Sequence, residues 1–332
     1  MMGKGDSVVV CGGGGFIGGH LVGDLIRKGF EDVKCVDVKP RNQWYQVHPE
    51  ATNVVADLNL KDAAFEATKD RDVVINLACN MGGMGFIENN KGLCMISVLI
   101  NTHLLMGAKE HGAKRFFYAS SACVYNGDKQ KDKKIETFLK EEDAYPALPE
   151  DGYGWEKLFS ERMCRHFRED WKTPTRVARF HNVYGPYGTW EGGREKAPAA
   201  ICRKVIEAKR SGKHEIEIWG DGQQTRSFMY ISDCLKGIYM ITESQNWHDP
   251  INLGSSEGVT INQLVDIAEE IGGVKLKRKY NLDAPKGVNG RNSDNTLIKQ
   301  TFNWEPDTKL RDGLEVTYRW INDQMASRAA SK

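Results

Sequence analysis

The feature that most constrains the fold is a glycine-rich turn between an apolar strand and a helix near the N-terminus. Residues 7–11 (Ser-Val-Val-Val-Cys) predict a buried strand, and helical spacing follows the turn. Gly12, Gly15 and Gly18 lie within the turn. Glycines at this spacing permit a tight turn, close approach of a pyrophosphate and close helix packing, and the helix N-terminus offers amide donors. The turn therefore predicts a dinucleotide-binding unit.

A carboxylate follows this turn at the expected distance. The second predicted strand, residues 33–37, ends in Asp37. Its side chain would accept hydrogen bonds from the adenosine ribose and repel a 2′-phosphate, which favours NAD over NADP. Lys39 and Arg41 stand nearby and weaken that preference. The alternative, a flexible glycine turn without a ligand, is disfavoured because strand, turn, helix and carboxylate occur in this order.

Strands and helices continue to alternate through the first half of the chain. Residues 53–57, 72–78 and 115–119 predict further strands. This alternation predicts an α/β fold, a Rossmann-type doubly wound parallel sheet with a smaller α/β C-terminal substrate lobe, and ligands at the carboxyl ends of the strands. The predicted cofactor-binding residues, in addition to the catalytic pair Tyr153 and Lys157 described below, are Gly12, Gly15, Phe16, Ile17, Gly18, Asp37, Asp57, Leu58, Leu77 and Ala78.

Three side chains further along form a candidate catalytic group. Tyr153 and Lys157 are four residues apart and share one helical face, and Ser121 follows a predicted strand. A lysine cation can lower the pKa of a phenol from about 10 towards neutrality. Such a trio can deprotonate an alcohol while a cofactor takes the hydride. The alternative is an ordinary surface helix, because Tyr-x-x-x-Lys often arises by chance.

Composition narrows the functional classes. The chain has 332 residues and a formal charge of +1, which argues against polyanion binding and predicts no nucleic-acid or membrane partner. The eight cysteines include no Cys-x-x-Cys pair and predict reduced core residues rather than a metal site. No signal-peptide run is present and no segment reaches about eighteen apolar residues. These features predict a soluble cytoplasmic protein.

The segments between the motifs predict a substrate contact and an oligomer. The loop 79–86 contains three Gly and two Met and leaves the sheet where a nicotinamide should lie. Its Gly82 would let the backbone approach a substrate, although the two Met also suit simple packing. Residues 88–112 predict one long helix with two apolar faces. With the helix after Tyr153 it suggests the four-helix interface of a homodimer, and a buried layer within one chain is the alternative.

The second half predicts the substrate lobe. Arg226 and Arg291 come from separate segments and are candidates to clamp a pyrophosphate, because guanidinium forks match phosphate oxygens. Surface salt bridges are the alternative for both. Ser232 and Thr260 predict helix N-caps. The remaining predicted elements are a charged loop over 129–140, a returning strand at 250–254 and a terminal helix over 310–325. The predicted dinucleotide-binding domain covers 1–180, and 222–252 return to it. The predicted substrate lobe consists of 181–221 and 253–326, and a disordered tail covers 327–332.

Together these motifs resemble a known family. The glycine turn, Asn76-Leu77-Ala78, Ser121 and Tyr153-x-x-x-Lys157 resemble the extended short-chain dehydrogenase/reductases that act on nucleotide sugars. Within that family four stretches resemble the GDP-mannose 3,5-epimerases, and the resemblance covers about residues 7–325. Those stretches are 81–87, 118–123, 179–200 and 290–295. The chain departs from the family pattern at Asn80, where an acid is expected, and at Asn126-Gly127, which replace Pro-Glu.

The resemblance implies chemistry beyond a simple dehydrogenase. It implies that bound NAD makes a transient ketone at C4 of GDP-mannose, and that Cys123 and Lys196 then exchange protons at C5 and C3. The products would be GDP-L-galactose and the C5 epimer GDP-L-gulose. His181 is predicted to be structural. The predicted substrate-binding residues are Gly82, Ser121, Cys123, Asn182, Glu195, Lys196, Ala197, Lys204, Gln224, Arg226 and Arg291.

Two alternative functions remain open from the sequence. One is a related activity, such as a UDP-hexose 4-epimerase. A dehydratase is disfavoured because Ala122-Cys123 offers no carboxylate after Ser121. The other alternative is a non-catalytic module that senses a dinucleotide.

Overall fold

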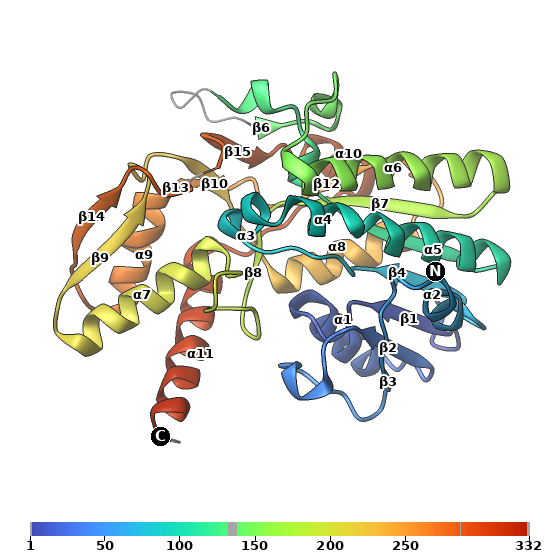
Figure 1. The fold of residues 1–332 in the computed structure, drawn as a ribbon, viewed down its shortest axis with the longest axis horizontal. Coiled ribbons are helices and arrows are strands. Elements are labelled where there is room, and N and C mark those ends of the chain that lie inside the picture. The colour runs from blue at the N-terminus through green and yellow to red at the C-terminus, as the bar shows by residue number, and fades with distance from the viewer. Residues whose placement is uncertain (1, 132–137, 286, 331–332) are drawn as a thin grey trace.

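A seven-stranded parallel sheet forms the centre of the protein (Figure 1). The computed structural model describes residues 2–131, 138–285 and 287–330. The strand order is β12-β7-β5-β4-β1-β2-β3, and every pairing is parallel. This arrangement confirms the predicted Rossmann-type fold. The strands are β1 (Val8–Cys11), β2 (Val33–Asp37), β3 (Thr52–Val55), β4 (Val73–Asn76), β5 (Arg115–Ser121), β7 (Thr175–Phe180) and β12 (Ile251–Leu253).

Helices cover both faces of this sheet, which explains why all four residues of β1 are apolar. Val8 and Val10 pack into the core on the side of α1 (Phe16–Arg27) and α8 (Ile231–Glu243). Val9 and Cys11 point the other way, into the core formed with α2 (Lys61–Thr68), α5 (Val98–Glu110) and α6 (Asp151–Trp171). A strand buried on both faces reads as a continuous apolar run.

The second half of the chain builds a smaller lobe with its own core. Helices α7 (Ala197–Ser211), α9 (Ile261–Gly272) and α11 (Leu310–Ala330) pack together through Cys202, Leu264 and Leu314. Its four-stranded sheet has the order β13-β10-β15-β6, with β14-β9 and β11-β8 as two-stranded pairs. These strands are β6 (Phe138–Leu139), β8 (Val183–Tyr184), β9 (Glu215–Trp219), β10 (Thr225–Ser227), β11 (Met229–Tyr230), β13 (Gly258–Thr260), β14 (Lys277–Asn281) and β15 (Gly290–Ser293).

The chain crosses between the two parts more than once. After β7 it enters the lobe, returns as α8 and β12, and leaves again to form β13. The predicted returning strand at 250–254 is therefore confirmed, since β12 pairs with β7. Because parallel strands end at one edge, the loops after β4, β5 and β7 face the lobe together (Figure 1).

Two expected helices differ from the structure, and a third agrees with it. The predicted helix over 88–112 is three helices, α3 (Met84–Asn89), α4 (Lys91–Ile96) and α5, interrupted at Asn90 and Ser97. Helix α8 begins at Ile231 with Tyr230 as its N-cap, so Ser232 lies inside the first turn rather than at the cap. Thr260 is a cap as predicted, because it shares a capping box with Gln263 at the start of α9.

The last predicted boundaries also change. Helix α11 continues to Ala330, so the predicted disordered tail at 327–332 is helical as far as the described residues reach. The expected loop at 129–140 is partly regular, since it contributes β6, which pairs with β15. Residues 132–137 of that loop lie outside the described residues. A further helix, α10 (Thr296–Phe302), follows β15.

One helical stretch of the described chain has the length and composition of a membrane span. It covers Lys91–Glu110, with a mean hydropathy of 1.3, and 44% of it is buried inside the protein. Buried helices of globular proteins meet the same criteria. Here α5 packs against α2 and α6, so much of its apolar surface is covered within the chain.

Candidate functional site

The three predicted catalytic side chains meet at the carboxyl end of β5. Ser121 is the last residue of this strand, and its Oγ accepts a hydrogen bond of 3.2 Å from the Cys123 N–H. Helix α6 begins at Asp151, which places Tyr153 in its first turn and Lys157 one turn later. The Lys157 Nζ lies 5.6 Å from the centroid of the Tyr153 ring and donates a 3.0 Å hydrogen bond to the Ala119 carbonyl.

A buried carboxylate that sequence reasoning missed supports this lysine. Glu156 is 3% exposed, and its Oε1 accepts 3.0 Å hydrogen bonds from the Tyr118 and Ser160 hydroxyls. Its Oε2 lies 3.8 Å from the Lys157 Nζ. Burial acts to lower the pKa of Lys157, but Cys79 and Glu156 outweigh it and raise that pKa. The lysine therefore stays charged inside the protein.

The expected effect of Lys157 on Tyr153 is corrected by the structure. Burial raises the pKa of Tyr153 well above its usual value, Cys79 and Cys123 add to the rise, and a hydrogen bond to Ser121 opposes it. Among the protein's own groups, desolvation of the phenolate outweighs the attraction of the lysine cation. The phenol is thus neutral in the protein alone.

Cys123 and Lys196, the thiol and the ammonium expected at the sugar ring, come from different elements of the chain. Cys123 lies in the short helix η2 (Ala122–Val124) and is 7% exposed. Lys196 is the N-cap of α7, in the lobe. Burial and then Glu150 raise the pKa of Cys123, whereas Arg291 and Lys196 act to lower it. Burial lowers the pKa of Lys196, with Cys123 opposing and Arg291 adding to that change. The charge state of each group therefore affects the pKa of the other.

Arg291 is held against the thiol. Its Nη1 lies 3.3 Å from the Cys123 Sγ, its Nη2 donates 2.8 Å to Glu150 and its Nε donates 2.7 Å to Gln130. Strand β15 pairs with β10 so that Arg291 lies directly beside Arg226. Pyrophosphate binding by these two arginines stays a prediction, and sequence reasoning missed both Glu150 and Gln130.

The glycine turn leaves no room for side chains. Gly12 has a φ of +84°, and a Cβ there would lie 2.9 Å from the backbone N of Ala78, at the end of β4. A Cβ on Gly18 would lie 2.2 Å from the Gly12 carbonyl oxygen. The loop after β1 and residues 77–78 therefore form one tight backbone surface at the N-terminus of α1, where Phe16 and Ile17 form the first turn. Such a surface fits the pyrophosphate of NAD.

The other predicted cofactor contacts lie along the same edge. Asp37 is 7% exposed at the end of β2, and its Oδ1 accepts a hydrogen bond of 2.9 Å from the Lys39 N–H. The Lys39 Nζ donates 2.8 Å to the Gly14 carbonyl, so this cation closes over the glycine turn. Asp57 binds Asn59, and Leu58, at 3% exposure, belongs to the hydrophobic core. Among the described residues no cluster of His, Cys, Asp or Glu is arranged to hold a metal ion.

The predicted substrate contacts fall into two groups, and the first borders the group formed by Ser121, Cys123 and Tyr153. The Gly83 N–H donates 3.1 Å to the Arg194 carbonyl, which joins the loop of Gly82 to the loop of Lys196. Asn182 has a φ of +37° and donates 3.2 Å to the Ser227 carbonyl.

The second group is turned towards the lobe. Glu195 accepts hydrogen bonds from Gly193 and Arg203, just before Ala197 begins α7. Gln224 donates 2.8 Å to the Trp219 carbonyl, and its buried Oε1 has no partner among the described residues. The Lys204 Nζ donates 2.9 Å to the Glu217 carbonyl and lines a different pocket, so the structure does not bring it to the Cys123 cluster.

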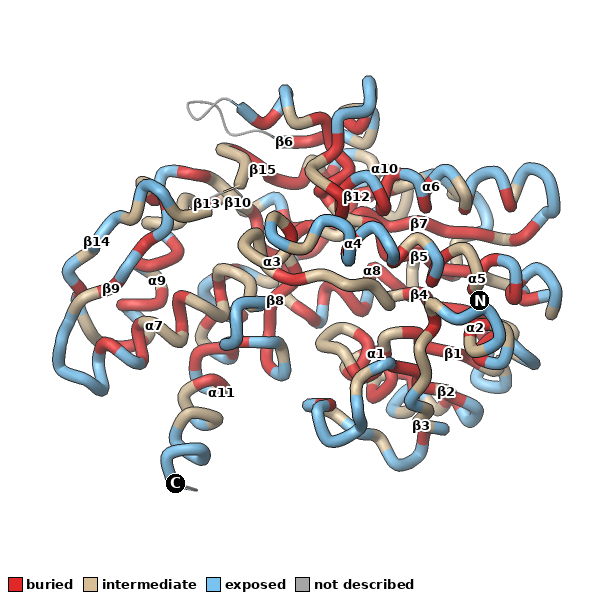
Figure 2. The backbone as a smooth tube through the Cα atoms, in the orientation of Figure 1, coloured by how far each residue is buried: buried red, intermediate tan, exposed pale blue. Residues whose placement is uncertain are grey.

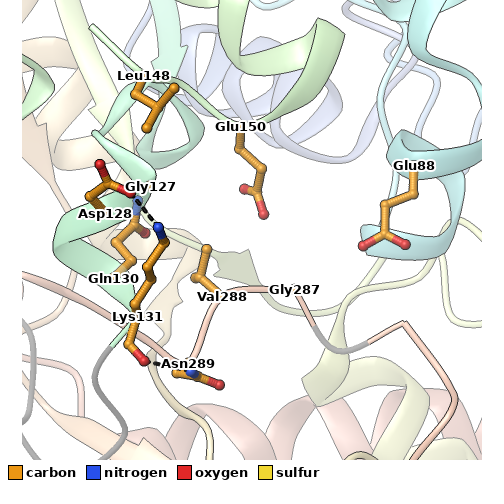
Figure 3. Close-up of a pocket in the computed structure, with 10 residues that line it drawn as sticks. All are labelled: Glu88, Gly127, Asp128, Gln130, Lys131, Leu148, Glu150, Gly287, Val288 and Asn289. Atoms are coloured by element: carbon orange, nitrogen blue, oxygen red, sulfur yellow. Dashed lines mark hydrogen bonds and ion pairs between the residues drawn. The ribbon is translucent and has the colours of Figure 1, made fainter. Parts of the chain in front are cut away.

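A cavity of about 600 Å³ is lined by Gln130 and Glu150, the two residues that bind Arg291 (Figure 3). Glu150 and Glu88 point into it from the helical side, and Val288 lies on the opposite wall. Its volume is in the range of small-molecule sites. Its full lining is Glu88, Gly127, Asp128, Gln130, Lys131, Leu148, Glu150, Gly287, Val288 and Asn289.

Comparisons with known proteins agree with this geometry. Residues 8–254 match the family described as NAD dependent epimerase/dehydratase. GDP-mannose 3,5-epimerase 1 from Oryza sativa subsp. indica is 43% identical over 319 residues, which cover 96% of this chain and 82% of that protein. GDP-mannose 3,5-epimerase from Arabidopsis thaliana is 40% identical over 324 residues, covering 97% and 84% of the two chains.

Solved structures share the fold over nearly the whole chain. UDP-glucose 4-epimerase from Thermotoga maritima superposes with a TM-score of 0.84 at 23% identity, covering 96% of this chain and 99% of that one. MoeE5 in complex with UDP-glucuronic acid and NAD superposes with a TM-score of 0.80 at 25% identity, covering 96% and 99%. The chain is therefore an NAD-dependent isomerase. It belongs to the NAD dependent epimerase/dehydratase family and, within it, to the GDP-mannose 3,5-epimerases.

Proposed function

We propose that this protein converts GDP-mannose to GDP-L-galactose, with GDP-L-gulose as the C5 epimer, by inverting C3 and C5. The observation that carries the proposal is the placement of Cys123 and Lys196. Cys123 follows β5, bonds Ser121 through its N–H and packs in one cluster with Tyr153. Lys196 caps the start of α7, in the loop whose Arg194 carbonyl accepts a hydrogen bond from Gly83. Relatives named for this reaction support the choice of substrate.

The residues of the chain have separate tasks in this reaction. NAD supplies the reversible acceptance of a hydride, and its positively charged ring favours the phenolate of a neighbouring tyrosine. Tyr153 takes the proton of the C4 hydroxyl, Ser121 holds that oxygen, and Lys157 keeps a positive charge beside the phenol. A C4 ketone acidifies the hydrogens on C3 and C5. Cys123 and Lys196 then remove and return protons on opposite faces of the ring.

Incubation of GDP-mannose in deuterated water tests the reaction directly. We expect mass spectrometry and NMR to find deuterium at C3 and C5 of the product. Tyr153→Phe should lower turnover by at least about a hundredfold, because it removes the acid-base group for C4. Cys123→Ser should abolish inversion while leaving NAD bound. A product inverted only at C4 and free of deuterium would instead indicate a UDP-hexose 4-epimerase type of activity.

We also propose that the protein is a homodimer joined through α4, α5 and α6. These helices have exposed residues on their outward faces (Figure 2), and several of those residues are large and apolar, whereas the inward faces are buried. An exposed apolar surface of this kind is typical of a protein interface. Its residues are Leu93, Met95, Ile96, Leu99, Met106, Trp155 and Phe159. Cytoplasmic localisation stays a prediction from the sequence.

A further inference from the structure

Glu150 is a largely buried carboxylate beside Cys123 and Arg291 that the proposed reaction does not use. It precedes the first residue of α6, and its side chain is 13% exposed. Its backbone N–H donates 2.9 Å to the Cys123 carbonyl. Its Oε2 accepts 2.8 Å from the Arg291 Nη2, and the Arg291 Nη1 lies 3.3 Å from the Cys123 Sγ. Glu150 is thus tied to Cys123 both through the backbone and through Arg291.

Arg291 cannot easily leave this position. Its side chain is 7% exposed, and its Nε donates 2.7 Å to the Gln130 Oε1. Gln130 and Glu150 therefore fix the plane of the Arg291 guanidinium, and its third nitrogen, Nη1, points at the Cys123 sulfur. A guanidinium held by two acceptors is a rigid donor.

We propose that Glu150 is a positioning residue for the proposed epimerisation, because it holds Arg291 against Cys123. Through this contact it sets whether the proton exchanged between Cys123 and Lys196 resides on the sulfur or on the nitrogen. This inference rests on the proposed function, in which the two side chains act as a pair. The role belongs to the charge and position of Glu150, which does not itself exchange a proton with the sugar.

The proton balance of the pair explains why this control matters. A thiolate that removes a proton from C5 becomes a thiol as the C–H bond breaks and its electrons pass to the enolate of the C4 ketone. The Lys196 ammonium gives a proton to the opposite face and becomes an amine. One proton must then move from sulfur to nitrogen, directly or through solvent, before the pair can act at C3. The local charges set the equilibrium of that transfer.

Opposite charges around Cys123 act in opposite directions. The negative charge of Glu150 favours the thiol, and the positive charges of Arg291 and Lys196 favour the thiolate. Burial favours the uncharged state of both members of the pair, because it raises the pKa of Cys123 and lowers that of Lys196. The ionisable and polar groups around the pair are Ser121, Tyr153, Cys79, Cys94, Glu150, Arg226 and Arg291.

Glu150→Gln separates charge from geometry, because the amide oxygen can still accept from Arg291. The readout is the ultraviolet absorbance of the Cys123 thiolate against pH, measured without sugar as the difference between each variant and the same variant carrying Cys123→Ser. At pH values below the midpoint of the Cys123 titration, we expect Glu150→Gln to increase the thiolate fraction by about three- to tenfold. This corresponds to a fall in the pKa of Cys123 of about half to one unit. Arg291→Met should decrease it.

A matched control lies at the rim of the same cavity. Asp128 is 61% exposed and does not contact Arg291, so Asp128→Asn should leave the titration unchanged. A Cys123 midpoint that stays constant or rises in Glu150→Gln would overturn the proposal. A purely structural role would lower thermal stability without moving the midpoint.

The titration is independent of the deuterium experiment on GDP-mannose. If the midpoint falls as expected but no deuterium enters C3 or C5, the proposed function fails while the control of Cys123 by Glu150 stands. If deuterium enters normally and the midpoint does not move, only the role of Glu150 fails. In the active enzyme we also expect Glu150→Gln to shift the pH profile of kcat more than it changes KM.

Discussion

Among single residues, His181 shows how burial decides the role of a titratable side chain. It follows β7 near the substrate cluster, is fully buried, and its Nε2 lies 3.0 Å from the Asn252 Oδ1. Its Nδ1 has no partner among the described residues. Burial, assisted by Arg291 and Arg179, lowers the pKa of His181 from 6.5 to about 3. The side chain is a neutral structural group, as the sequence predicts.

This buried histidine should make stability depend on pH. The folded protein keeps His181 neutral down to about pH 3, whereas the unfolded chain binds a proton near pH 6.5. The unfolded state therefore gains protons first as the pH falls, and stability is lost progressively between these two values. We expect the contribution to be about 2 kcal/mol between about pH 7.5 and 5.

Urea unfolding at several pH values measures this effect. His181→Gln removes the titration, so the free energy of unfolding of this variant should fall less steeply with pH than that of the unchanged protein. The packing lost in this variant lowers stability at every pH, and for that reason only the slopes are compared. Parallel slopes would show that His181 does not carry the pH dependence.

At the scale of elements, the glycine turn is a place where the fold does not tolerate added side-chain atoms. The backbone of the turn, the first turn of α1 and the end of β4 approach within contact distance. A Cβ on Gly18 would lie 2.2 Å from the Gly12 carbonyl oxygen and 2.7 Å from the Gly13 Cα. Both neighbours are backbone atoms, so the turn itself must shift to accept a side chain.

Gly18→Ala should therefore lose NAD and stability together. We expect the free energy of unfolding to fall by about 1–3 kcal/mol, the usual cost of overpacking, and retained NAD in the purified protein to fall at least several-fold. Thermal unfolding and assay of the NAD released on denaturation measure the two effects. Gly5→Ala is the control, because a Cβ there meets nothing within 4 Å. Full NAD retention in Gly18→Ala would contradict this account of the turn.

At the scale of the whole molecule, one face is left apolar. Helices α4, α5 and α6 bury one side inside the protein, and the outward side of α6 exposes Phe159 at 56% and Trp155 at 45%. The interruptions at Asn90 and Ser97 keep α4 and α5 short, so the surface is formed by several helices rather than one long one. This surface also accounts for the high hydropathy of residues 91–110.

The homodimer proposal is tested by charge substitution on this face. We expect light scattering after size exclusion to give twice the mass of one chain for the unchanged protein. Phe159→Glu should yield monomers, because a buried unpaired charge at an interface costs several kcal/mol. Leu282→Glu changes a residue that is even more exposed, at 68%, outside α4, α5 and α6 and should leave the dimer intact. Dissociation of both variants, or a monomeric starting protein, would contradict the proposal.

The sequence by itself determined the parallel sheet and the cofactor class, and it predicted the side chains of the catalytic group. Each depends on short-range patterns: apolar strands, a glycine turn, and Tyr153 and Lys157 four residues apart on one helix. Periodicity and spacing record such local geometry directly. The helix over 88–112 was wrongly predicted as one element, because apolar spacing does not record that the backbone leaves the helical conformation at Asn90 or that the helix is interrupted at Ser97.

Only the tertiary structure decided what surrounds those groups. Glu150, Glu156 and Gln130 carry no motif, and each reaches the site through a contact with a residue from another element or with the catalytic lysine. The structure also decided that desolvation, rather than Lys157, dominates the pKa of Tyr153. Burial and long-range contacts depend on how distant segments pack, and a linear pattern does not record that packing.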